Sequence, residues 1–192
     1  IVSDGTNLYV ADQYNHTIRK IVISTGVVST FAGTAGSSGS TNATGTAARF
    51  KSPHHITTDG TNLYVTDTHN HMIRKIVISS RVVTTLAGSA GNIGSTDGTG
   101  TIARFNYPEG ITSDGTNLYV SDTANDRIRK IVISSGVVTT LAGSSHGFAD
   151  GTGTSAKFKH PIGITSDGTN LYVTDYSDHT IRKIVISTGA VT

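Results

Sequence analysis

The stretch DGTNLYVTDTHNHMIRKIVIS, residues Asp59–Ser79, decides the fold because nearly the same string occurs four times in the chain. The copy that begins at Asp114 differs from it at four of 21 positions. Each copy contains a Leu-Tyr-Val marker, and successive markers are 55, 55 and 53 residues apart. The markers begin at Leu8, Leu63, Leu118 and Leu171. A fixed period of this length is typical of a repeat architecture, in which each unit is one piece of supersecondary structure.

The third unit shows the strand pattern that all the units share. Gly110–Gly115 is short and rich in β-branched residues, and Asn117–Asp122 alternates along β-forming residues. The Asp-Gly-Thr-Asn that joins them predicts a hairpin turn. Ile128–Ser134 and Gly136–Gly143 follow as a third and a fourth strand, before a long Gly/Ser/Thr-rich loop. No segment has the 3.6-residue period of an amphipathic helix. We therefore expect an all-β fold, a β-propeller made of four-stranded antiparallel blades that bury their faces against one another.

We expect residues 1–192 to form one domain, a propeller segment of four blades. The first unit opens within its first strand at Ile1, and the last unit stops at Thr192 within its fourth strand. These ends predict a truncated last blade and a segment that is part of a larger propeller or array. Open blade faces would leave apolar surface and unpaired strand edges in water. Further blades of the same protein, or a second copy of the chain, are the expected partners of those faces.

The composition excludes several kinds of site. The 192 residues include 22 Gly and no Cys, and 35 % of them are hydrophobic. Without Cys there is no disulfide, no Cys-ligated zinc and no thiol nucleophile. No apolar run reaches about 18 residues, so we expect no membrane span. The formal net charge is +2, and the repeated Arg-Lys pairs are matched by repeated Asp residues. Because no unmatched basic patch stands out, we do not expect a nucleic-acid partner.

Three motifs resemble those of the NHL-repeat β-propellers, and together they cover essentially the whole chain. The opening P-x-G-I-T-x-D occurs at Pro108–Asp114 and Pro161–Asp167, and LYV-x-D-x-x-N-x-x-IRKI occurs at Leu63–Ile76. VVTTLAGS at Val137–Ser144 is followed by DGTGT-x-A-[RK]-F at Asp150–Phe158. The resemblance implies a propeller, commonly of six blades, that binds protein, RNA or another ligand and in some members catalyses lyase or hydrolase reactions. This chain departs from the family in having four copies and longer units, the extra length being the Gly/Thr-rich loop.

An acid and a base recur at fixed positions in every unit. The acid ends the second strand and the base begins the third, seven residues later. Hairpin geometry can bring the two side chains together, with the guanidinium fork satisfying the carboxylate. Since every unit has such a pair, we interpret the pairs as structural rather than as a ring of charges around a ligand. The pairs are Asp12 with Arg19, Asp67 with Arg74, Asp122 with Arg129, and Asp175 with Arg182.

The eight histidines raise the question of a metal site. Three of them, His16, His71 and His179, occupy one repeated position, where the third unit carries Asp126. They would converge only if that turn faced the central axis. The DGTGT stretches carry one acid each, too few for the six to eight oxygens of a calcium site, and we interpret them as turns. We therefore expect no bound metal and no cofactor.

Residues that break the repeat gather near the proline that opens each blade. This proline precedes the innermost strand, close to the mouth of a propeller channel. In the second unit His54 and His55 replace the Glu-Gly and Ile-Gly pairs that follow the other two prolines. With the residues just before those prolines they form one rim, which we expect to contact a partner. The rim residues are His54, His55, Asn106, Tyr107, Glu109, Lys159 and His160.

Three classes of function fit these features. The first is a non-enzymatic scaffold that binds a protein or another macromolecule outside the cell or on its surface, since the richness in Ser, Thr and Gly and the lack of Cys fit an extracellular bacterial protein. The second is a metal-assisted lyase or hydrolase with His54, His55 and His160 as ligands or bases. The third is RNA binding, for which Tyr107 and Lys159 are the main support. The near-identity of the units favours the scaffold, because a tuned active site needs several differentiated residues.

Overall fold

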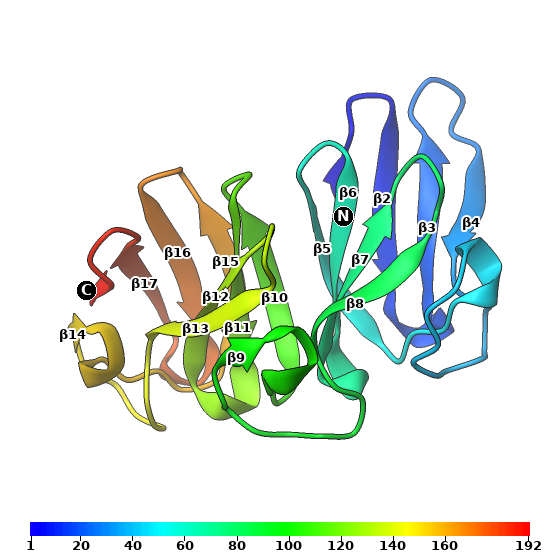
Figure 1. Cartoon of the computed structure of the whole chain (residues 1–192). Coiled ribbons are helices and arrows are strands. Elements are labelled where there is room, and N and C mark those ends of the chain that lie inside the picture. Colours follow the sequence, from blue (N-terminus) through cyan, green and yellow to red (C-terminus); the bar gives the residue numbers. More distant parts are fainter.

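The computed structural model describes residues 1–192 and confirms the all-β propeller fold, with four antiparallel sheets that follow one another in chain order (Figure 1). Each sheet is one blade, and its four main strands pair in sequence order from the innermost to the outermost. Blade 1 contains β1 (Val2–Ser3), β2 (Asn7–Asp12), β3 (Thr17–Val22) and β4 (Val28–Ala32). Blade 2 contains β5 (Pro53–Thr58), β6 (Asn62–Asp67), β7 (Met72–Val77) and β8 (Val83–Gly88). Blade 3 contains β10 (Pro108–Ser113), β11 (Asn117–Asp122), β12 (Arg127–Val132) and β13 (Val137–Ala142). Blade 4 contains β15 (Pro161–Ser166), β16 (Asn170–Asp175), β17 (Thr180–Val185) and β18 (Ala190–Val191).

The remaining regular elements are short. Each long inter-blade loop has one 3₁₀ turn, and in every blade another 3₁₀ turn joins the second strand to the third. The seven turns are η1 (Gln13–Asn15), η2 (Gly45–Ala47), η3 (Thr68–Asn70), η4 (Gly100–Ile102), η5 (Thr123–Asn125), η6 (Gly153–Ser155) and η7 (Tyr176–Asp178). No helix of the structure combines the length and the apolar character required to cross a bilayer.

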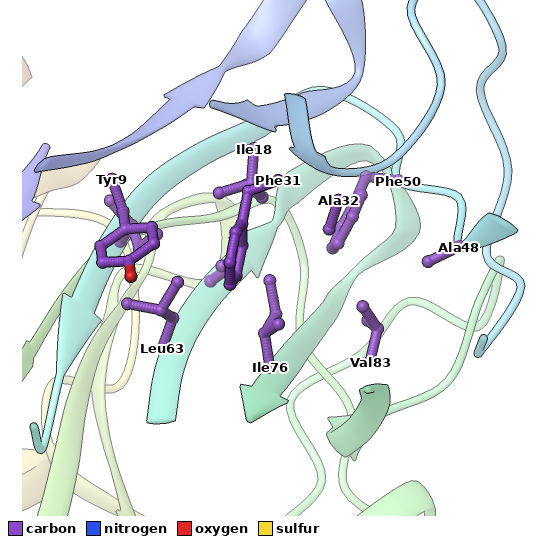
Figure 2. Packing of buried hydrophobic residues seen from close by; sticks show 11 residues of the cluster. Tyr9, Ile18, Phe31, Ala32, Ala48, Phe50, Leu63, Ile76 and Val83 are labelled. Carbon is purple, nitrogen blue, oxygen red and sulfur yellow. The ribbon is translucent and has the colours of Figure 1, made fainter. Parts of the chain in front are cut away.

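Alternation along the strands explains why one blade needs its neighbours. In blade 2, Leu63 and Ile76 are directly opposed across β6 and β7 and face blade 1, whereas Tyr64 faces blade 3. The side chains of one strand therefore enter two different cores. Figure 2 shows the core between blades 1 and 2, where Tyr9, Ile18 and Phe31 of blade 1 lie over Leu63 and Ile76. Three such cores lie between the four blades.

The long loop packs as part of the next blade, so the interpretation of the DGTGT stretches as turns was only partly right. Gly98–Thr99 forms the short strand β9, which pairs with Val137 and Val138 of blade 3 before η4 begins. β14 (Gly151–Thr152) pairs in the same way with β18 of blade 4. Further along each loop a Phe is fully buried between two blades: Phe50, Phe105 and Phe158. The loop is thus a strap that closes the outer edge of the following blade.

The Asp-Gly turn between the first and second strands is held by one carboxylate. Asp59 accepts hydrogen bonds from the backbone N–H groups of Thr61 at 2.9 Å and Asn62 at 2.7 Å, and from the Tyr64 hydroxyl at 2.7 Å. Partial burial tends to raise the pKa of Asp59, but the hydrogen bonds from Tyr64, Asn62 and Thr61 outweigh it and lower the pKa to about 2. The same bonds form at Asp4, Asp114 and Asp167.

These turns should make the fold sensitive to acid. The pKa of an Asp in an unfolded chain is about 3.9, so a folded pKa of about 2 stabilises the fold above roughly pH 4, and that stabilisation is lost as the pH falls from there through about 2. In Tyr64→Phe one donor is gone, and the pKa of Asp59 should rise towards the ordinary Asp value. Carboxyl-carbon NMR titration of Asp59 measures this directly. Tyr14→Phe is the control, because the Tyr14 side chain is exposed and has no hydrogen-bond partner at its hydroxyl. An unchanged Asp59 titration in Tyr64→Phe would contradict the assignment.

Candidate functional site

The repeated Asp–Arg pairs lie inside the blade interfaces. Asp67 and Arg74 approach to 2.9 Å and Asp122 and Arg129 to 2.7 Å, and all four side chains are completely buried. Asp175 and Arg182 are 3.5 Å apart and also buried. Asp12 and Arg19 are likewise 3.5 Å apart, but 26 % and 33 % of their side chains remain exposed. The pairs therefore hold the blades from within and present no charge to a ligand in the three buried cases.

Each buried guanidinium also binds the loop strap that precedes its blade. Arg129 donates to the backbone carbonyls of Arg104 at 2.9 Å and Thr96 at 3.1 Å, and to the Asp97 carboxylate at 2.7 Å. The guanidinium also lies over the Phe105 ring, 5.2 Å from its centroid. Equivalent side-chain acceptors, always 32 residues before the Arg, are Asn42 for Arg74 and Asp150 for Arg182. This constant spacing was a signal in the sequence that pointed to the strap.

In the first three units, the turn after the repeated Asp holds the next blade by a hydrogen bond. The residue that follows the 3₁₀ turn has a positive φ, and in the first three units its side chain accepts a backbone N–H from the blade ahead. His16 Nδ1 accepts from Ser52 and His71 Nδ1 accepts from Tyr107, each at 3.1 Å. Burial, with the charges of His69 and Lys51, lowers the pKa of His71, which favours the neutral ring that an acceptor requires. These histidines serve separate junctions and do not converge.

The residue before each blade-opening proline is held in one fixed conformation. Ser52, Tyr107 and His160 have φ values of 51°, 50° and 55°. Their N–H groups donate to the side chains of His16, His71 and Asp126 of the preceding blade, which we call the pin residues. The N–H one residue earlier donates at 2.7 Å to the buried Asp of its own blade. We call Ser52, Tyr107 and His160 the display positions. The backbone there is the same at every junction, whereas the side chain changes, and 43 % of Tyr107 is exposed.

The inner strands carry the other predicted rim residues. His54 is exposed on β5 and Glu109 is partly exposed on β10, which lies beside both β5 and β15. His55 is half-buried, and its Nδ1 accepts from the Ile111 N–H at 3.3 Å. Burial, followed by the nearby N-terminal charge and His54, lowers the pKa of His55. Blade 3 has Gly110 at the place of His55, where a Cβ would collide with the Ile162 carbonyl.

The structure places the seven rim residues at one end of the blades but groups them by junction. Tyr107 packs edge-on against His69 and His71, with ring centroids 5.3 and 4.8 Å apart. His160 lies beside His146, with ring centroids 5.3 Å apart. Lys159 Nζ is 3.9 Å from Asp178 Oδ1, and Asn106 contributes its N–H to Asp122. His54, His55 and Glu109 stand on the inner strands.

A hollow of about 350 Å³ lies beside the inner strand of blade 4. It is lined by His55 from blade 2 and by residues of β15, β16 and β17, among them Ile164, Tyr172 and Ile181. The lining surface is mainly apolar, and it includes Ile164 and Val173 of the core between blades 3 and 4 as well as Ile181, which is 66 % exposed. Of the predicted rim residues, His55 alone contributes to it.

Comparisons with known proteins agree with this architecture. No family model matches the sequence. The human NHL repeat-containing protein 2 is 31 % identical over 144 residues, which is 70 % of this chain and 20 % of that protein. A structural genomics protein of unknown function from Bacteroides thetaiotaomicron superposes over 97 % of this chain and 45 % of its own, with a TM-score of 0.74 and 25 % identity. An auxiliary nutrient binding protein from the same organism matches 92 % of this chain and 44 % of its own, with a TM-score of 0.71 and 23 % identity. The chain thus spans a fifth of that curated relative and less than half of those solved chains.

Proposed function

Since this chain is an array of NHL-type β-propeller repeats, we propose that it is a non-enzymatic binding scaffold whose proline-end rim contacts a protein partner. The rim is the predicted set, His54, His55, Asn106, Tyr107, Glu109, Lys159 and His160, at the end of the blades where the inner strands begin. We further propose that the protein works outside the cell or on its surface, in keeping with its polar, Gly-rich composition and its lack of Cys.

The observation that carries the proposal is a constant frame with variable display positions. The buried Asp and the pin fix the backbone around Ser52, Tyr107 and His160 in the same way at three junctions. What differs is the side chain, which is exposed at Tyr107 and His160 and buried at Ser52. A rigid backbone that presents different side chains lowers the entropy cost of binding, and a partly exposed Tyr is typical of protein interfaces. The auxiliary nutrient binding protein with the same fold is named for a binding role, which is compatible with such a scaffold.

The rim should be the surface that peptide ligands select. A library of random peptides would be panned against the intact chain, and the affinity of each selected peptide measured by calorimetry. In the variant His54→Ala/Tyr107→Ser/Glu109→Ala, which places at 107 the Ser that blade 2 has at its own display position, affinity should fall by about tenfold or more, roughly 1.4 kcal/mol.

The matched control lies at the opposite end of the same blades. Thr61→Ala/Thr116→Ala/Ser134→Ala changes three exposed side chains beside the Asp-Gly turns and should leave the affinity within about twofold. Both variants should melt within a few degrees of the parent chain. If the peptides bind the rim variant normally, or lose binding in the control variant, the rim is not the binding surface.

A further inference from the structure

The junction between blades 3 and 4 holds a group of side chains that no other junction has. Asp126, His146 and His160 each offer a ligand atom, and these atoms all lie within 4.8 Å of one another. The three residues come from the turn after β11, from the loop after β13 and from the display position before β15. His160 is one of the predicted rim residues, whereas His146 is not.

Asp126 is oriented so that one oxygen remains available. Its Oδ1 accepts the His160 N–H at 2.9 Å, which is the pin bond that His16 and His71 make at the other junctions. Its Oδ2 lies 3.3 Å from His146 Nδ1. Two ligands on one tetrahedral zinc ion, each at about 2.1 Å, are about 3.4 Å apart, so this pair already has the separation that a shared ion needs.

His160 is oriented by a second contact. Its Nδ1 is 2.9 Å from the Ser177 hydroxyl, an interaction in which the ring nitrogen can donate to the oxygen. A histidine that donates from one ring nitrogen presents the other as a lone pair, and this is the usual arrangement around a metal ligand. The His146 and His160 side chains are exposed, so their torsions can adjust to bring both nitrogens to the ion.

The segment between β13 and His146 is shorter than the equivalent segment of the second unit. In the second unit Gly88 and Ile93 are five residues apart, whereas in the third unit Gly143 and His146 are three apart. Ile93 and His146 are equivalent, because each forms a bridge to the buried Phe of its loop. Relative to the second unit, the third unit therefore lacks two residues directly before His146. This brings His146 closer along the chain to the end of β13.

The remaining charges nearby are already engaged. The Arg127 guanidinium donates to the carbonyls of Ser95 and Ser144, each at 3.5 Å. The Lys159 ammonium is paired with Asp178. The three ligands together carry one negative charge when both rings are neutral, which suits a divalent cation.

We propose that Asp126, His146 and His160 form a binding site for a zinc-class divalent cation at the junction of blades 3 and 4. Two imidazoles and one carboxylate are ligands that Zn²⁺ accepts, and a set of three leaves one coordination position open to water or to an incoming ligand. The site shares His160 with the rim, but the proposed rim function requires no metal.

The test uses the tag-free chain of residues 1–192, titrated with ZnCl₂ by calorimetry and with Co²⁺ by visible absorption. We expect one Zn²⁺ per chain and a Co²⁺ spectrum with the intense d–d bands of a four-coordinate site. His146→Ile and His160→Tyr introduce the residues that the preceding junction carries at these positions, Ile93 and Tyr107, so both are compatible with the fold. Each should weaken Zn²⁺ binding by at least about tenfold.

The control is His179→Asn, which removes an exposed histidine with positive φ from blade 4 and keeps a residue that tolerates this conformation. It should bind Zn²⁺ as the parent chain does. Zn²⁺ binding that persists in His146→Ile, a stoichiometry other than one, or a weak six-coordinate Co²⁺ spectrum overturns the proposal. Because peptide binding at the rim is measured without added metal, failure here leaves that separate result unaffected.

Discussion

Arg129→Ala should lower the free energy of unfolding by about 3–5 kcal/mol, because it leaves the completely buried Asp122 carboxylate without its counter-charge. It also removes the guanidinium that joins blade 3 to its loop strap through Asp97 and through the Thr96 carbonyl. Urea denaturation followed by circular dichroism measures the change. Arg19→Ala is the matched control at the equivalent position of blade 1, since Asp12 and Arg19 are partly exposed and 3.5 Å apart. An exposed pair of this kind contributes about 0–1 kcal/mol.

A second set of variants separates the contribution of the charge to stability from that of side-chain packing. Arg129→Met keeps most of the side-chain volume but still leaves Asp122 buried and unpaired. Arg129→Met combined with Asp122→Asn removes the lone charge, so the double variant should be more stable than Arg129→Met alone by about 1–3 kcal/mol. Equal losses for Arg129→Ala and Arg19→Ala would show that burial of the pair has no energetic consequence.

The sequence predicted the parts of the fold that are coded locally. Alternation of β-forming residues in Asn117–Asp122 and the Asp-Gly turn before it determine a hairpin, and the structure has β11 at those residues. The course of the long loop was not coded in this way. Gly98–Thr99 reads as part of a turn, and it becomes a strand because the edge of β13 in the next blade offers N–H and C=O groups to pair with. Such pairing depends on tertiary position rather than on propensity.

The candidate site likewise has one part that the local sequence predicts and another that depends on tertiary position. The position of His160 beside a blade-opening proline was visible in the repeat alignment, and so was its exposure. Its neighbours were not visible, because Asp126 and His146 lie 34 and 14 residues before it in separate connections. The shorter third unit was the one local indication. Comparison of Gly143–His146 with Gly88–Ile93 would have placed the two-residue deletion at His146 and drawn attention to that residue.

Glycines with nearly the same backbone conformation should differ sharply in their tolerance of a side chain. Gly88 and Gly60 have φ values of +88° and +87°, so a change to Ala strains the backbone equally at both, by about 1–2 kcal/mol. A Cβ on Gly60 would meet no atom within 4 Å. A Cβ on Gly88 would lie 2.5 Å from the His71 carbonyl oxygen and 3.1 Å from the buried Phe105 ring.

Gly88→Ala should therefore cost about 1–3 kcal/mol more than Gly60→Ala, because overpacking is added to the common strain. The excess arises where three elements meet: the end of β8, the pin residue His71 and the strap residue Phe105. None of them can move away freely, since His71 accepts the Tyr107 N–H and Phe105 fills the core between blades 2 and 3. Urea denaturation of both variants gives the difference directly. Gly143→Ala should repeat the result at the next junction, where the Asp126 carbonyl and Phe158 crowd the same position. Equal stability of Gly88→Ala and Gly60→Ala would mean that the blades separate to admit a methyl group, and that the junctions are looser than the contacts at Gly88 require.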